Sequence, residues 1–185
     1  VDRARAAKVG FDKHADITTG PVIDGRAWTR LKGLVDDAVA GGATLLAGGE
    51  RPTGMNAGHF LAPTVLAGVT ETMAVYREET FGPIVSIVPF DDNTDLLRMA
   101  NDCEEGGLTA YVFTRDLARA EHFSAHLRYG EIQINGVKYD IDLPHGGIGQ
   151  SGFGHDCSAL ALHDYLVQKR ITRALDTTTF GGLNP

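Results

Sequence analysis

The sequence is poor in cysteine and has no long apolar run, and both absences narrow what the chain can be. Only Cys103 and Cys157 occur among the 185 residues, and their spacing fits neither a metal site nor a redox motif. No apolar run reaches the length of a membrane span, and no signal peptide opens the sequence. We therefore expect a reduced, cytoplasmic setting.

Basic patches are missing as well. The net charge is −7, and neither a block of Lys and Arg nor a stripe of interleaved aromatics offsets it. This charge disfavours non-specific binding to nucleic acid or to an anionic membrane. The sequence has no internal repeat and no obvious linker, and its length suffices for one domain with a sizeable core, or for one domain plus an appendage.

Helical and strand patterns alternate along the chain, which predicts an α/β domain with a mostly parallel sheet and flanking helices. Pro63 interrupts the extended stretch 60–69, which suits an edge strand or a loop. Asp116 is expected to cap a helix over 117–127. The other predicted helices are 28–38, 94–101 and 159–168, and the predicted strands are 43–47, 84–90, 108–114, 131–135 and 170–175.

The stretch from Arg77 to Val85 is the most informative part of the sequence. Two carboxylates run into an aromatic, a Gly-Pro turn and a β-branched run that predicts a buried strand. Pro83 fixes its own φ, so Glu79 and Phe81 stand on a stiff turn at the mouth of that strand, where ligands are commonly held. Composition alone also allows Glu79 to be a solvated turn acid.

A glycine-rich stretch from Pro144 to Gly154 contains a formal G-x-G-x-x-G pattern. A dinucleotide fingerprint needs a buried strand running into it, and 140–142 is a poor one, so this interpretation is disfavoured. Two alternatives remain open: a backbone that turns sharply near a ligand or another strand, and a purely structural loop.

His155, Asp156 and Cys157 follow directly on one another, so their side chains diverge and a catalytic triad is disfavoured. We expect Asp156 to cap the following helix or to interact with its dipole, and Cys157 to be a small buried residue. No set of His, Asp and Glu has the spacing of metal ligands.

Taken together, six motifs in order and register resemble those of aldehyde dehydrogenases. The E-E-x-F-G-P of that family matches residues 78–83, and its G-L-x-A-x-V-F-T matches 107–114 after Ala100-Asn101. The remaining matches are Gly20-Pro21, Gly48-Gly49 with Pro63-Thr64-Val65, the G-x-[VI]-x-[VI]-N of 130–135, and the P-F-G-G-x-K-x-S-G-x-G of 144–154.

This resemblance implies the C-terminal portion of a catalytic domain over 1–169, an oligomerisation strand over 170–175 and a flexible tail over 176–185. The parent reaction is NAD- or NADP-dependent oxidation of an aldehyde to a carboxylic acid. In the family the catalytic cysteine, the general-base glutamate and the Rossmann domain precede this region, so the chain alone is expected to be inactive. The implied partners are a small aldehyde, the preceding domain and further copies in a homo-oligomer.

The resemblance also assigns roles by position. Glu79 matches the glutamate that holds the nicotinamide ribose, and Phe81 matches the aromatic beside the nicotinamide. Asp156 aligns with an acidic residue assigned to proton relay, and Gly152 with a glycine whose carbonyl binds a monovalent cation such as K⁺ in some members. The substrate tunnel is assigned Val137, Lys138, Tyr139, Asp140 and His145.

The sequence departs from the family pattern at several points. His145 stands where Phe is usual, Gly149 stands where Lys is usual, and 104–106 carries one extra residue without the usual Tyr. A polar tunnel loop with His145 favours a small polar aldehyde over an aromatic one. The alternative to an enzyme fragment is a non-catalytic assembly or regulatory module that kept the fold.

Overall fold

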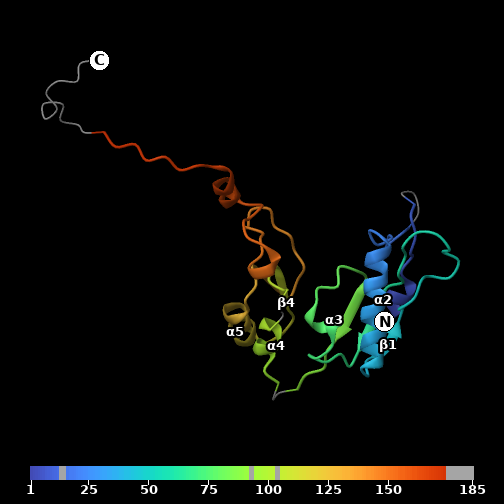
Figure 1. Ribbon diagram of the computed structural model, residues 1–185. Helices are drawn as coiled ribbons and strands as arrows, with labels where there is room; N and C mark the ends of the chain where they lie inside the picture. Colours follow the sequence, from blue (N-terminus) through green and yellow to red (C-terminus); the bar gives the residue numbers. More distant parts are fainter. Residues whose placement is uncertain (13–15, 92–93, 103–104, 174–185) are drawn as a thin grey trace, which may run out of the picture.

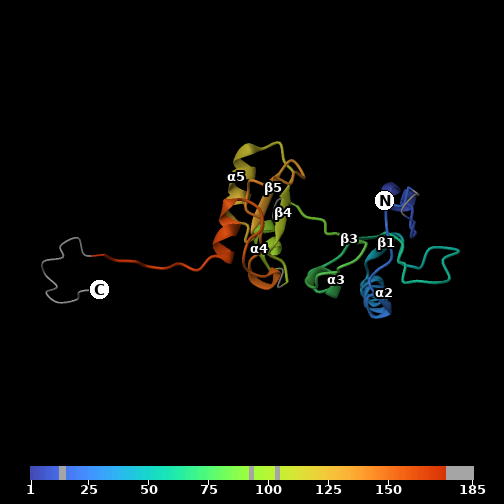
Figure 2. The same cartoon turned by 90° about the horizontal axis from the view of Figure 1, so that it is seen from above.

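The elements of the computed structural model, which describes residues 1–12, 16–91, 94–102 and 105–173, fall into two lobes. Figures 1 and 2 show the first lobe, residues 1–91, around α2 and β1, and the second lobe, residues 94–165, around α4, α5 and β4. Residues 166–173 leave the second lobe as an extended segment. No helix of the described residues is both long and apolar enough to cross a membrane.

The first lobe is built on α2 (Gly25–Ala40), which follows a short α1 (Asp2–Ala6). The Asp24 carboxylate caps α2 by accepting a hydrogen bond from the Ala27 amide at 2.8 Å. Two glycines follow its last residue, as the sequence predicts. The buried face has the expected helical spacing and consists of Leu31, Leu34, Val35 and Ala38.

A three-stranded sheet packs against α2, with β1 (Thr44–Ala47), β2 (Thr64–Ala67) and β3 (Ile84–Ile87) in the order β1-β2-β3. β1 is antiparallel to β2, and β3 is parallel to β2 after a crossover containing α3 (Ala74–Arg77). The prediction of an edge strand or loop over 60–69 is wrong, because β2 is central. Pro63 is tolerated since it precedes the first paired residue.

The core of the first lobe lies between α2 and this sheet. Its buried cluster draws on the helix, on β2 and on the crossover, and consists of Leu34, Val35, Ala38, Ala43, Leu66, Val69 and Val75. Leu31 is also completely buried, and Gly82, before β3, lies against it. The helix α2 therefore fixes both the sheet and the turn that enters β3.

The second lobe contains α4 (Leu96–Asn101), β4 (Thr109–Val112), α5 (Leu117–His126) and β5 (Glu131–Ile134). β4 and β5 form a parallel pair joined by α5, in which Thr109 lies opposite Glu131. Asp116 caps α5 as predicted, accepting a hydrogen bond from the Arg119 amide at 3.1 Å. Two 3₁₀ helices follow, η1 (Gly149–Ser151) and η2 (Ala159–Tyr165).

The α/β class, the flanking helices and the alternation of helices and strands are confirmed, and two of the three described strand pairings are parallel, as the sequence predicts. The described strands form two separate sheets, and the larger one is mixed. The helix expected over 159–168 is a 3₁₀ helix that ends at Tyr165. Strand β3 is not buried on both faces, because Val85 and Ile87 on one face stay exposed.

The predicted oligomerisation strand over 170–175 lies only partly within the described residues. Residues 170–173 form no strand pairing with the other described residues. Residues 174–175 and the predicted flexible tail over 176–185 lie outside the described residues. The role of this segment in oligomerisation therefore stays a prediction.

Candidate functional site

The turn between α3 and β3 presents the two residues singled out by the sequence. Helix α3 ends at Arg77, and Pro83 immediately precedes β3. The Glu79 side chain is exposed, and its carboxylate has no hydrogen-bond partner among the described residues. The Phe81 side chain is 79% exposed, and its φ of 47° lies in the left-handed region that a bulky residue rarely adopts. An acceptor and an aromatic face are thus both available to a ligand.

Arg30 of α2 holds this turn from the side of the first lobe. Its Nη2 donates to the carbonyl oxygens of Glu79 at 3.1 Å and Thr80 at 2.5 Å. Its Nη1 lies 3.6 Å from the Glu78 carboxylate. Hydrogen bonds from a charged donor are stronger than neutral ones, so Arg30 restricts the backbone while leaving the Glu79 side chain free.

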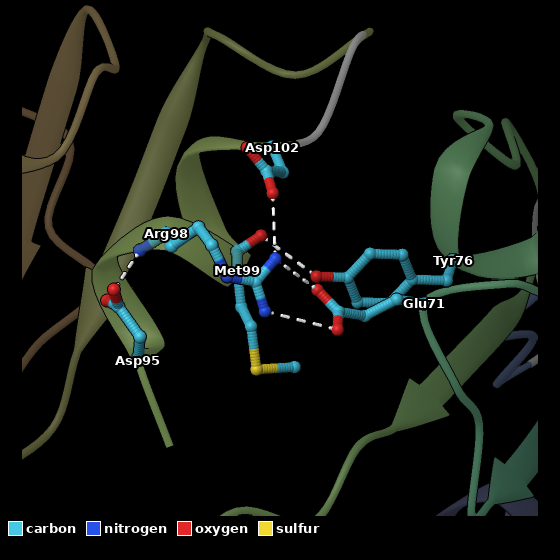
Figure 3. Close-up of polar contacts among 6 residues, drawn as sticks. All are labelled: Glu71, Tyr76, Asp95, Arg98, Met99 and Asp102. Atoms are coloured by element: carbon cyan, nitrogen blue, oxygen red, sulfur yellow. Dashed lines mark hydrogen bonds and ion pairs between the residues drawn. The ribbon is translucent and has the colours of Figure 1, made fainter. Parts of the chain in front are cut away.

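The two lobes meet at a polar joint, which we define as Glu71, Tyr76, Arg98, Met99 and Asp102 and which Figure 3 shows. Arg98 Nη1 lies 2.8 Å from an oxygen of Glu71 and 2.8 Å from one of Asp102, and its Nη2 lies 3.2 Å from the second Glu71 oxygen. Tyr76 Oη donates to the Met99 carbonyl at 2.8 Å. The Glu71 and Asp102 hydrogen bonds raise the pKa of the Arg98 guanidinium.

A second group of predicted residues gathers in the second lobe. The backbones of His145 and Asp156 form an antiparallel bridge, with N···O distances of 2.9 and 2.8 Å. The His145 ring packs edge-on against Tyr139, and its Nδ1 lies 3.0 Å from Glu131 Oε2. Tyr139 Oη lies 2.7 Å from Cys157 Sγ. Five polar side chains thus converge from β5, the loop after it and the stretch that follows η1.

Hydrogen bonds shift the pKa values of three groups here. Bonds from Gln133 and His145 lower the pKa of the Glu131 carboxyl. The contact with Cys157, followed by desolvation, raises the pKa of Tyr139 to about 12. The backbone amide of Asp142, followed by Lys138, lowers the pKa of Asp140. Near neutral pH the loop therefore presents ionised carboxylates and a neutral phenol.

Most of the predicted tunnel residues line one cavity of about 500 Å³ beside β5. Lys138, Tyr139, Asp140 and His145 line it, together with Glu131, while the exposed Val137 lies outside that lining. Asp156 lines a neighbouring cavity that also contains His145. The predicted set thus separates into a turn in the first lobe, with Glu79 and Phe81, and a polar cluster in the second.

Several residues that shape these sites were not identified from the sequence. Arg30 contacts Glu79 from 49 residues away, and Glu131 contacts His145 from 14 residues away. Glu105, 26 residues beyond Glu79, accepts a hydrogen bond from its amide, and no local pattern signals such contacts. Asp156 was expected to cap a helix, but Ser158 caps η2, because the Asp156 backbone is engaged with His145. Cys157 was expected to be buried, yet it is half-buried beside Tyr139.

The glycine-rich stretch passes close to the ends of β4 and β5. The Ile148 amide donates to the Gly107 carbonyl at 3.0 Å, and a Cβ at Gly130 would overlap the Gly146 carbonyl oxygen. Of the alternatives left open by the sequence, this contact favours a backbone that turns near other strands. At Gly152, φ is 98°, and the carbonyl has no hydrogen bond within the described part of the chain.

Comparison with known proteins agrees with the motifs. The aldehyde dehydrogenase family matches residues 1–171. The chain belongs to this family. It is 39% identical over 170 residues to the non-phosphorylating aspartate-semialdehyde dehydrogenase of Halomonas elongata, covering 91% of this chain and 34% of that protein. It is 37% identical over 174 residues to betaine aldehyde dehydrogenase of Mesorhizobium japonicum, covering 92% of this chain and 36% of that protein.

Solved aldehyde dehydrogenases share the fold. An aldehyde dehydrogenase of Mycobacterium tuberculosis complexed with NAD⁺ is 33% identical, with a TM-score of 0.81 over 89% of this chain and 34% of that one. Succinate-semialdehyde dehydrogenase from Burkholderia pseudomallei is 38% identical, with a TM-score of 0.82 over 90% of this chain and 34% of that one. The chain therefore spans about a third of the length of the relatives it matches.

Proposed function

We propose that this chain forms part of an NAD- or NADP-dependent aldehyde dehydrogenase, in which it supplies the nicotinamide-ribose clamp and one wall of the substrate tunnel. The observation that carries the proposal is the Glu79 turn, where a restrained backbone bears an exposed Phe81 ring and a carboxylate with no partner in the described part of the chain. Membership of the family supports the reaction, and the solved relative complexed with NAD⁺ supports the cofactor.

The residues of the turn fit a nicotinamide nucleotide. The Glu79 carboxylate would accept hydrogen bonds from the two ribose hydroxyls, each worth about 1.5–3 kcal/mol because the acceptor is charged. The Phe81 ring would lie beside the nicotinamide, which accepts the hydride when the aldehyde is oxidised. Arg30 would keep the backbone of the turn in place before the cofactor arrives, so only the Glu79 side chain would need to be ordered on binding.

The second lobe would select the aldehyde. The 500 Å³ cavity beside β5 is lined by Lys138, Asp140 and the His145–Glu131 pair, which offer both charges and hydrogen-bond donors. An apolar substrate would leave these groups unpaired, so we propose a small polar aldehyde. The names of several relatives point the same way, since they specify aspartate, glutarate and succinate semialdehydes and betaine aldehyde.

Other roles complete this proposal. Asp156 would serve in proton relay, and the Gly152 carbonyl would bind a monovalent cation such as K⁺. The nucleophilic cysteine, the base and the dinucleotide-binding domain would come from the part of the enzyme that this chain does not span. The chain alone would then be inactive and would bind NAD weakly, and the complete enzyme would be a cytoplasmic homo-oligomer.

The proposal is tested by Glu79→Gln in the complete enzyme. The amide keeps the size of the side chain but removes its charge, so we expect KM for NAD to rise or single-turnover hydride transfer to slow, by roughly tenfold. Glu121→Gln on α5 is a matched control, because this exposed carboxylate has no partner among the described residues. Unchanged steady-state and single-turnover kinetics in Glu79→Gln would refute the clamp.

A further inference from the structure

The backbone amide of Glu79, in the first lobe, donates a hydrogen bond to a residue of the second lobe. Helix α3 ends at Arg77, and Glu78 is extended with φ −96° and ψ 144°. The Glu79 N–H therefore cannot bond within the helix, and an orphan backbone donor needs an acceptor elsewhere. That acceptor is the Glu105 carboxylate, whose Oε2 lies 2.6 Å from the Glu79 nitrogen.

The polar joint anchors the end of α4, four residues before Glu105 in the sequence. Arg98 ties the end of α4 to the loop before α3, through Asp102 on one side and Glu71 on the other. A bidentate arginine joining two carboxylates restrains geometry better than an isolated surface pair. Glu105 follows α4 by four residues, and its carboxylate reaches the Glu79 turn from the second lobe.

We propose that Glu105 is a positioning residue, which acts through the Glu79 amide to orient the ribose clamp. This inference rests on the proposed function of Glu79. It explains a feature that the family pattern leaves without a role, since Glu105 stands in the segment that carries one extra residue and lacks the usual Tyr. Glu105 thus supplies a carboxylate from the second lobe to a turn of the first.

The turn needs such support because its backbone is strained. Phe81 has a φ of 47°, and a non-glycine residue persists in this region only where its surroundings hold it. Arg30 binds the carbonyl side of the turn, and Glu105 binds its amide side. Without Glu105 the turn would be held by the first lobe alone, and the backbone that carries the Glu79 side chain would be less well restrained.

A double-mutant cycle in the complete enzyme tests this inference. The proteins are Glu105→Ala, Glu79→Gln, the double variant, Glu105→Gln as the conservative variant and Glu121→Ala as the control. We expect Glu105→Ala to raise KM for NAD roughly tenfold, with KM for the aldehyde unchanged. Glu105→Gln retains an acceptor oxygen and should recover most of the loss. Glu121→Ala should match the wild type.

The decisive result is the double variant. If Glu105 acts through Glu79, adding Glu105→Ala to Glu79→Gln should change KM for NAD less than twofold, whereas independent effects would multiply. If Glu79→Gln is impaired while Glu105→Ala is neutral, or if the two effects multiply, the inference is wrong and the clamp stands. If Glu79→Gln is itself neutral, the clamp fails and the inference fails with it.

A second measurement separates positioning from general loss of stability. Hydrogen exchange at the Glu79 amide should accelerate in Glu105→Ala and return toward the wild-type rate in Glu105→Gln, while amides in β2 remain protected. Uniformly faster exchange across the first lobe would indicate ordinary destabilisation and would overturn the proposed role.

Discussion

Replacing Gly82 by alanine should destabilise the chain, although glycine-to-alanine changes often stabilise proteins. The φ of Gly82 is not positive, so alanine fits the backbone and should gain about 0.4–1 kcal/mol by restricting the unfolded chain. A Cβ at this position would however overlap Leu31 Cδ1 and lie 2.7 Å from its Cδ2. Leu31 is completely buried, and overpacking a filled core costs about 1–3 kcal/mol. The net expectation is a loss of about 1–2 kcal/mol.

Urea denaturation gives the free energy of unfolding for this comparison. Gly33→Ala is the control, because Gly33 lies in α2 and a methyl group added there would meet nothing within 4 Å, so this change should gain about 0.5–1 kcal/mol. Leu31→Ala alone should cost about 2–5 kcal/mol, and in that background Gly82→Ala should become neutral or favourable. A Gly82→Ala protein as stable as the wild type, or an equal loss in both backgrounds, would refute the steric argument.

Three further expectations concern a buried hydroxyl, an ionised carboxylate and self-association. Thr64→Val should lose about 1–3 kcal/mol of stability, because the hydroxyl accepts from the buried Gly49 amide at 2.9 Å; Thr64→Ser, which keeps the oxygen, should lose less in urea denaturation. The hydrogen bond from Gln133 is the largest cause of the lowered pKa of the Glu131 carboxyl. The ionised carboxylate therefore stabilises the fold above pH 4.5, and this stabilisation is lost as the pH falls through the folded-state pKa. The urea midpoint of Glu131→Gln should therefore fall less between pH 7 and pH 4 than that of the wild type. At tens of micromolar the chain should form dimers or larger species, since β3 is an edge strand with exposed apolar residues; a strictly monomeric result in light scattering would contradict this.

Local chemistry explains which parts of the fold could be predicted. The periodicity of α2 and the cap at Asp116 act over a few residues, and both are found where the sequence places them. The partition into two sheets could not be predicted, because strand pairing depends on distant segments and on twist rather than on any strand's own pattern. Pro63 illustrates the limit, since β2 begins at Thr64, one residue after it, so the proline is compatible with a central strand.

The residues of the candidate site likewise fall into those that the sequence could predict and those that it could not. Glu79 and Phe81 were identifiable because their motif is contiguous and ends in a rigid Gly-Pro turn. Arg30 reaches this turn from 49 residues away, and the charge of an arginine on a helix surface does not reveal which carbonyls it will bind. Glu131 was treated as part of a strand, and only the folded chain brings its carboxylate beside His145.

The unusual backbone at Phe81 sets stability and function against each other at one position. Glycine would adopt the φ of 47° without strain, so a selection for thermostability alone should favour its appearance there. The same exchange would delete the ring that we place beside the nicotinamide. Laboratory evolution under selection for folding alone should therefore replace Phe81 before other residues. Selection for growth on an aldehyde should restore the aromatic residue and lower the melting temperature.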